Sequence, residues 1–189
     1  MVLRSKLRNF GLGLAMAGFC SLGAVAQAGS TNTDMSTGSH ATASDRTFMR
    51  KAAEGGKAEV ELGKLAQEKA ASQDVKQFGE RMVNDHTKAG DQLKQVAEKE
   101  GVTLPDKLNA KDAATKARLE KLSGGAFDRA YMQDMVKDHT QDVAEFRTEA
   151  KNGKDPEVKN FASQTVPTLE DHLKEAKSIA PKTTAQMTK

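Results

Sequence analysis

Four long stretches of this chain repeat apolar residues every three or four positions, which is the spacing of one face of an α-helix. Between residues 45 and 180, runs of β-branched residues are almost absent, whereas Ala, Glu, Lys and Gln are frequent. Each stretch is polar on its remaining sides, so none can bury its apolar stripe alone. The pattern therefore predicts an all-α fold in which the four stripes face one shared core.

Capping and turn signals set the limits of the expected helices. The first is expected from about Asp45 to Ala71, and the second from its N-cap Ser72 to Gly101. A connection of about 24 residues then carries a short helix at about 111–122. The third helix is expected after Gly124-Gly125, and the fourth after the Asn152-Gly153 turn, with Asp155 as its cap and Pro156 in the first position.

This order of elements is hairpin, long crossover, hairpin. A faint repeat supports it, because residues 75–79 (VKQFG) resemble residues 158–162 (VKNFA). Two similar helical hairpins joined by a long connection are typical of ferritin-like proteins. The predicted fold is a ferritin-like antiparallel four-helix bundle, with a long crossover carrying a short helix between its second and third helices.

The first 28 residues have the three parts of a secretory signal peptide. Three basic residues precede an apolar run over residues 10–25, which ends in Ala26-Gln27-Ala28, a small-x-small cleavage pattern. The run is too short and too rich in glycine for a good membrane span, and Phe19 before Cys20 argues against lipidation of that cysteine. We expect cleavage after Ala28 and a periplasmic or secreted protein, with no membrane insertion after cleavage.

The rest of the chain divides into three expected parts. Residues 29–44 are small and polar, which predicts a disordered linker. Residues 45–180 are expected to form the bundle, and residues 181–189 a disordered tail.

Composition excludes several classes of function. The whole chain has 29 basic and 26 acidic residues, but Arg4, Lys6 and Arg8 lie in the expected leader, which leaves 26 of each in the mature protein. A neutral, mixed surface gives no electrostatic footprint for nucleic acid. The single cysteine also lies in the leader, so disulfides and thiol catalysis are excluded from the mature chain. Neither a protein partner nor an oligomeric state is indicated by these features.

Three histidines occupy expected core positions, each on a different long helix and each directly after an aspartate. They are His86, His139 and His172. Glu59 holds an inward position on the first helix. Because consecutive helical residues point about 100° apart, each preceding aspartate should lie where it can orient a histidine of another helix. Counting from the turns places Glu59 and His86 at one level, but leaves His139 and His172 about 7 Å apart in axial rise.

Two interpretations of these residues remain open. They can form a metal site of Glu59, His86, His139 and His172, for which zinc, iron, manganese or copper are suitable ions. Alternatively, they can be neutral core histidines paired with carboxylates, since buried polar groups need partners. The sequence favours the second interpretation and a non-catalytic role, structural or associated with envelope stress. No phosphate-binding loop, haem attachment motif or catalytic triad order is present.

An ordered series of motifs carries a family resemblance. The series is KAEVELG at 57–63, MVxDH at 82–86, FDxxYxxxMVxDH at 127–139 and VPxLxxH at 166–172. Over about residues 45–180 the chain resembles the exported bacterial family known as domain of unknown function 4142. The resemblance implies a ferritin-like bundle and places Glu59 and the three histidines in family motifs, but implies no established activity. Di-iron ferritin-like proteins use Glu-x-x-His; here Val83, Val136 and Leu169 stand three residues before the histidines, which argues against a ferroxidase centre.

Overall fold

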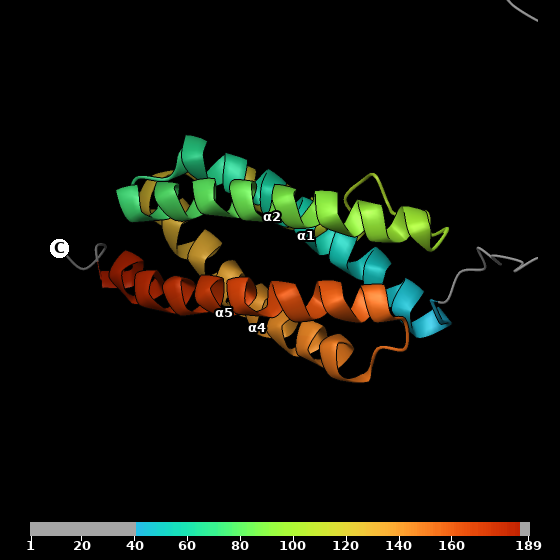
Figure 1. The fold of residues 1–189 in the computed structure, drawn as a ribbon. Coiled ribbons are helices and arrows are strands. Elements are labelled where there is room, and N and C mark those ends of the chain that lie inside the picture. Colours follow the sequence, from blue (N-terminus) through green and yellow to red (C-terminus); the bar gives the residue numbers. More distant parts are fainter. Residues whose placement is uncertain (1–40, 186–189) are drawn as a thin grey trace, which may run out of the picture. The chain divides into compact units, whose positions relative to one another are not determined.

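The computed structural model describes residues 41–185, and within this range the chain forms five helices and no strand. The helices are α1 (Ala43–Lys69), α2 (Gln73–Lys99), α3 (Ala110–Glu120), α4 (Gly124–Asn152) and α5 (Pro156–Ala185) (Figure 1). The all-α prediction is therefore confirmed for this part of the chain. The expected signal peptide, with Cys20, and residues 29–40 of the expected linker lie outside the described residues.

Two helix ends differ from the sequence-based limits. Helix α1 begins at Ala43, inside the expected linker, because Thr42 and Asp45 form a capping box in which each side chain bonds the other residue's backbone N–H. Helix α5 continues past Pro181 to Ala185, so the first part of the expected tail is helical. There Lys182 bonds Asp74 of α2 at 3.1 Å. The helix therefore extends beyond the limit that local composition predicts, and it contacts α2 there.

The long helices form two hairpins, α1 with α2 and α4 with α5, and the hairpins pack against each other through α2 with α5 and α1 with α4. Figure 1 shows α2 and α5 side by side across the front of the bundle. The short α3 contacts α1 and α4. No helix in the described range has the length and apolarity needed to cross a membrane.

Buried apolar side chains form two separate clusters along the bundle. One gathers the C-terminal part of α1 and the N-terminal part of α2, with Phe78 and Tyr131 among its largest members. The other gathers the N-terminal part of α1 and the C-terminal part of α2, with Met49 and Leu93 in its centre. Between the two clusters, each long helix contributes one buried polar residue. The core is thus divided by a polar layer.

Buried aspartates tie the turn of each hairpin to the other hairpin. Asp45 in the first turn of α1 accepts a hydrogen bond from the backbone N–H of Lys154, in the turn between α4 and α5. Asp128 in the first turns of α4 accepts from the backbone N–H groups of Ala71 and Ser72, in the turn between α1 and α2. Both carboxylates are fully buried. These bonds satisfy turn N–H groups and set the height of one hairpin against the other.

Two glycines let α1 and α2 approach closely. A Cβ atom on Gly63 would lie 2.6 Å from the backbone oxygen of Gly79, and a Cβ on Gly79 would lie 2.7 Å from the backbone oxygen of Gly63. Real Cβ atoms do not come so close to a backbone oxygen, so any larger residue here must push the helices apart.

We expect Gly79→Ala to destabilise the protein by about 1–3 kcal/mol, because the added methyl group overpacks the α1–α2 contact. The matched control is Gly90→Ala on the same helix, where a Cβ meets nothing within 4 Å. There, alanine should stabilise by up to about 1 kcal/mol through its higher helix propensity. Urea unfolding of both variants measures the difference. Equal effects of the two substitutions would show that the helices do not depend on this contact.

Candidate metal centre

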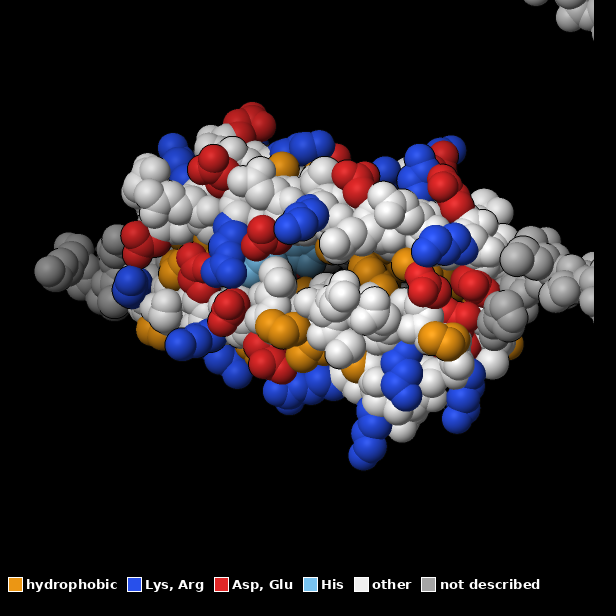
Figure 2. All heavy atoms as spheres, in the orientation of Figure 1, with side chains coloured by type: hydrophobic (Ala, Val, Ile, Leu, Met, Phe, Trp, Pro, Cys, Tyr) orange, Lys and Arg blue, Asp and Glu red, His pale blue; other side chains and the backbone are white. Residues whose placement is uncertain are grey.

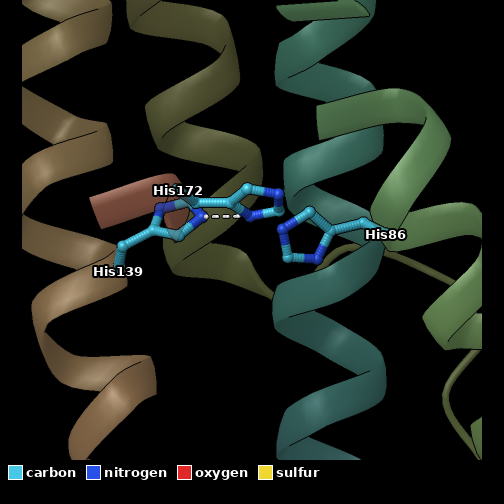
Figure 3. A group of neighbouring side chains, drawn as sticks. All are labelled: His86, His139 and His172. Atoms are coloured by element: carbon cyan, nitrogen blue, oxygen red, sulfur yellow. Dashed lines mark hydrogen bonds between the residues drawn. The ribbon is translucent and has the colours of Figure 1, made fainter. Parts of the chain in front are cut away.

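The polar layer brings together His86 of α2, His139 of α4 and His172 of α5 (Figure 3). Their exposed fractions are 8%, 0% and 0%, and one nitrogen atom from each ring lies within 4.8 Å of the others. The sequence prediction that all three point into the core is correct. Glu59 of α1 is the fourth polar residue of the layer, with 3% exposed.

His139 and His172 meet although counting along the chain placed them at different heights. Helical side chains lean toward the N-terminus of their own helix. His172 lies farther from the α4–α5 turn and leans toward it, whereas His139 lies nearer and leans away from it. In addition, α4 continues to Asn152, two residues beyond Ala150, from which the height of His139 was counted. Both effects reduce the mismatch, and the two rings come into contact.

The outer nitrogens of these two rings donate hydrogen bonds. Nδ1 of His139 lies 3.0 Å from the backbone oxygen of Met135, one turn earlier on α4. Nε2 of His172 lies 2.8 Å from a carboxylate oxygen of Asp85 on α2. A carbonyl or carboxylate oxygen can only accept, so both outer nitrogens carry protons. The inner nitrogens, His139 Nε2 and His172 Nδ1, face each other at 3.3 Å.

Burial favours the neutral form of all three rings. Together with the neighbouring His172, it lowers the pKa of His139 to about 3, although the hydrogen bond to Met135 opposes this shift. It also lowers the pKa of His86 well below the usual value, with His139 and His172 contributing in the same direction. Burial likewise lowers the pKa of His172, although the bond to Asp85 opposes this effect. A neutral imidazole has only one N–H. In the neutral state the two facing inner nitrogens of His139 and His172 therefore both present lone pairs, and the contact between them is a hydrogen bond when one ring takes up a second proton.

His86 completes the group. Its ring centre lies 5.7 Å from that of His139 and 5.3 Å from that of His172. Figure 3 shows the ring with one nitrogen directed at the other two rings. Nε2 of His86 is buried and has no hydrogen-bond partner in the protein. An unsatisfied buried nitrogen costs free energy unless something binds it.

Glu59 does not lie with the three inner nitrogens. Its Oε1 is 3.7 Å from Nδ1 of His139, the nitrogen that donates to Met135. Glu59 therefore lies on the side of the His139 ring that faces away from His86 and His172. The predicted four-residue site expected its carboxylate to lie beside the three inner histidine nitrogens. Burial raises the pKa of Glu59 well above the usual value, and Asp142 and Asp138 raise it further. Oε2 of Glu59 and the hydroxyl of Tyr131 are both buried without a hydrogen-bond partner.

Of the three aspartates that precede the histidines, one orients a histidine of another helix. Asp85 bonds His172, as the spacing predicted. Asp138 instead lies 3.9 Å from Lys111, and Asp171 is exposed. The predicted pairing of an aspartate with a histidine of another helix is therefore correct for one of the three aspartates. Only Asp85 lies at an edge of its helix's apolar face that is next to another helix with a histidine at the same height.

Sequence reasoning missed Arg81, which holds Asp85 in place. Its Nε lies 3.3 Å from Asp85 and its Nη1 lies 2.6 Å from Glu175 of α5. Burial raises the pKa of Asp85, but the hydrogen bonds from His172 and Arg81 outweigh this and lower the pKa overall. The carboxylate therefore stays ionised and accepts from His172. The four-residue spacing between Arg81 and Asp85 was the available signal.

The sequence matches a known protein family. The family model of DUF4142, a domain of unknown function, matches residues 30–179. The chain belongs to this family. The match confirms the resemblance that the motifs indicated, and it extends into the segment expected to be a linker.

A DUF305 fragment from Deinococcus radiodurans has a similar crystal structure, with a TM-score of 0.67 over 75% of this chain and 98% of that chain. Sequence identity between this DUF4142 member and the fragment is 17%, so the similarity shows the fold alone. No curated protein matches the chain. The family and the fold are therefore known, whereas the function has to be inferred from the geometry of the histidine site.

In the metal-free protein we expect His139 to stay neutral down to about pH 3. Its folded-state pKa lies below the unfolded value of about 6.5, so its contribution to stability is complete above pH 6.5 and falls as the pH drops. The loss should approach about 1.4 kcal/mol per pH unit for each such histidine. Histidine C–H resonances followed by NMR from pH 8 to pH 5 measure the protonation. A midpoint near 6.5 for all three rings would contradict their burial.

Proposed function

We propose that this protein binds one first-row transition-metal ion through His86, His139 and His172. The observation that carries the proposal is the 3.3 Å separation of His139 Nε2 and His172 Nδ1 in a buried layer, with the second nitrogen of each ring already bonded to an acceptor oxygen. Neutral rings in this arrangement repel each other unless a cation lies between them. The unpartnered Nε2 of His86 adds the third donor.

The spacing of the two facing nitrogens fits a metal ion. Zinc–imidazole bonds of 2.0–2.1 Å in a tetrahedral site place two ligand nitrogens about 3.3–3.4 Å apart, and the observed separation is 3.3 Å. The third nitrogen lies within 4.8 Å of the others, a distance that a rotation of the His86 ring can shorten. Three protein ligands and one open position are typical of tetrahedral sites that bind a further ligand.

The outer hydrogen bonds also support a metal centre. Histidines that bind metals usually donate their second N–H to a carboxylate or a backbone carbonyl, which fixes the ring and makes it a better ligand. His172 donates to Asp85 and His139 donates to Met135. The Arg81 network in turn holds Asp85.

The donor set narrows the choice among zinc, iron, manganese and copper. All three donors are imidazole nitrogens, and the nearest buried carboxylate, Glu59, lies behind His139. Imidazole suits zinc, copper and iron, whereas manganese prefers oxygen ligands. We propose zinc or copper as the bound ion, with manganese binding most weakly in line with the general order of affinities.

The second candidate role is a purely structural one, in which the histidines serve the fold without a metal. The bond of 2.8 Å between His172 and Asp85 supports it. This role leaves two buried lone pairs facing each other and Nε2 of His86 without a partner, so the metal-binding role accounts for more of the geometry. In both cases we propose a non-catalytic protein.

Metal titration of the chain purified without an affinity tag tests the proposal. After dialysis against a chelator, zinc or copper at 100 times its dissociation constant should stabilise the protein by about 2.7 kcal/mol, measured as a rise in melting temperature. We expect His86→Asn to lose roughly 100-fold in affinity, because one of three ligands is gone. This variant should fold, since Nε2 of His86 makes no bond within the protein.

The matched control is His40→Asn, which removes the one histidine outside the predicted site. It should bind the metal as the unchanged chain does. No shift with any of the four metals, or equal binding by His86→Asn and the unchanged chain, would favour the structural role instead.

We also propose that the protein is exported and has a ferritin-like fold. Export is supported by the basic, apolar and small-residue segments of residues 1–28. The fold is supported by the two hairpins and the connection between α2 and α4 that carries α3.

The expected mature protein begins at Gly29, because the cleavage pattern ends at Ala28. Mass spectrometry of the periplasmic fraction measures this N-terminus. Replacing Ala28 with a large residue, as in Ala28→Leu, should block cleavage and leave the longer chain, whereas Gln27→Leu at the tolerant middle position should not. An intact N-terminus, or a lipid on Cys20, would contradict the proposal.

A further inference from the structure

A cleft of about 600 Å³ enters the bundle beside the histidine layer. Its walls come from α1, α2, α4, α5 and the segment at residues 102–106, and His86 forms part of its surface. Figure 2 shows histidine and hydrophobic side chains at the bottom of the furrow between α2 and α5. A volume of this size is in the range that holds a drug-sized molecule.

On α2, α4 and α5 most of the lining of the cleft lies on one side of the histidine layer, whereas on α1 it continues past Glu59 to Lys64. Leu169 precedes His172 by three residues, Asp142 follows His139 by three, and Gly90 follows His86 by four; all three line the cleft. On these antiparallel helices, the three positions lie on the same side of the layer, toward the cluster that contains Leu93. Of the three histidines only His86 lines the cleft, so a small molecule in the cleft approaches the layer through His86.

The interior of the cleft is mainly apolar. Its lining includes Phe48, Leu93, Val102, Phe146 and Phe161, all of them buried members of the second hydrophobic cluster. Such a wall favours a ligand that gives up water at little cost.

Six of the ten charged residues that line the cleft form three ion pairs with one another. Lys51 lies 4.0 Å from Glu145, Lys64 lies 3.3 Å from Glu61, and Lys94 lies 4.0 Å from Glu98. All six residues line the cleft. The whole lining has four lysines (Lys51, Lys57, Lys64 and Lys94) and six carboxylates (Glu61, Asp91, Glu98, Asp106, Asp142 and Glu145), so its net charge disfavours an anionic ligand.

We propose that the cleft binds a neutral, mainly apolar small molecule with one nitrogen or oxygen donor at its end, and that this donor occupies the open position of the metal ion. The apolar walls support the apolar body of this ligand, the excess of carboxylates in the lining argues against an anion, and the contact with His86 supports the donor at its end. The donor part rests on the proposed metal site, whereas the apolar part stands on the cleft alone.

Two probes of one shape separate these parts. Biphenyl is apolar without a donor, and 4-phenylpyridine has the same outline with one ring nitrogen. Displacement of the neutral fluorophore N-phenyl-1-naphthylamine measures the binding of each. The metal-free protein should bind both probes with similar affinity. The zinc-loaded protein should bind 4-phenylpyridine roughly ten-fold more tightly or better, with biphenyl unaffected by the metal.

A variant that fills the cleft provides the control. Gly55 and Gly90 line the cleft, and a Cβ on either meets nothing within 4 Å. Gly55→Leu with Gly90→Leu should fold, since leucine favours a helix more than glycine does, and should weaken both probes roughly ten-fold or more. The paired alanine variant adds one methyl group at each position, so comparing the two variants separates filling of the cleft from the gain in helix propensity.

The outcomes distinguish the two proposals. If the metal-free protein binds neither probe, or if the leucine and alanine variants bind alike, the cleft proposal is wrong whatever the metal titration shows. If zinc binds but does not favour 4-phenylpyridine over biphenyl, the donor part is wrong. If no metal binds while both probes enter the metal-free protein and the leucine variant excludes them, the proposed metal site fails, the donor part fails with it, and the apolar cleft stands.

Discussion

Nε2 of His139 and Nδ1 of His172 face each other at 3.3 Å in the middle of this bundle, and much of the structure holds them there. Three buried histidines do not stabilise an apolar core as apolar side chains would. When both rings are neutral, the lone pairs of the two facing nitrogens repel each other at 3.3 Å. The arrangement persists in the fold because the outer nitrogens are tied to Met135 and Asp85, so neither ring can turn its proton inward without losing a bond. A cation between the rings resolves the conflict that burial and tautomer together create.

The rest of the bundle keeps this layer at one height. Apolar clusters above and below it supply the burial that stabilises a chain without disulfides in its described part. Asp45 and Asp128 each bind the turn of the opposite hairpin, which limits sliding of one hairpin along the other. The close approach at Gly63 and Gly79 fixes α1 against α2. Such sliding would separate the imidazoles, so the hydrogen bonds and the packing at the ends of the bundle support the geometry at its centre.

Several features of the site were predictable because helices convert sequence spacing into direction. The 3–4 spacing placed His86, His139 and His172 in the core, and the structure confirms all three positions. The same rule gave only partial success for the aspartates, since Asp85 faces α5 while Asp171 faces solvent. Whether a residue at the edge of a stripe meets a partner depends on which helix lies beside that edge. Periodicity within one helix carries no such information.

The sequence by itself determined that the fold of residues 41–185 is all-α, where the long helices lie to within a few residues, which of the histidines at 86, 139 and 172 are buried and which family the chain belongs to. Only the tertiary structure decided that His139 and His172 touch, that Glu59 stands behind the donors, that α5 continues to Ala185 and that a cleft reaches His86. The reason is physical. Local features depend on residues three or four positions apart, whereas donor geometry depends on the tilt and height of separate helices, which the packing of the whole core sets.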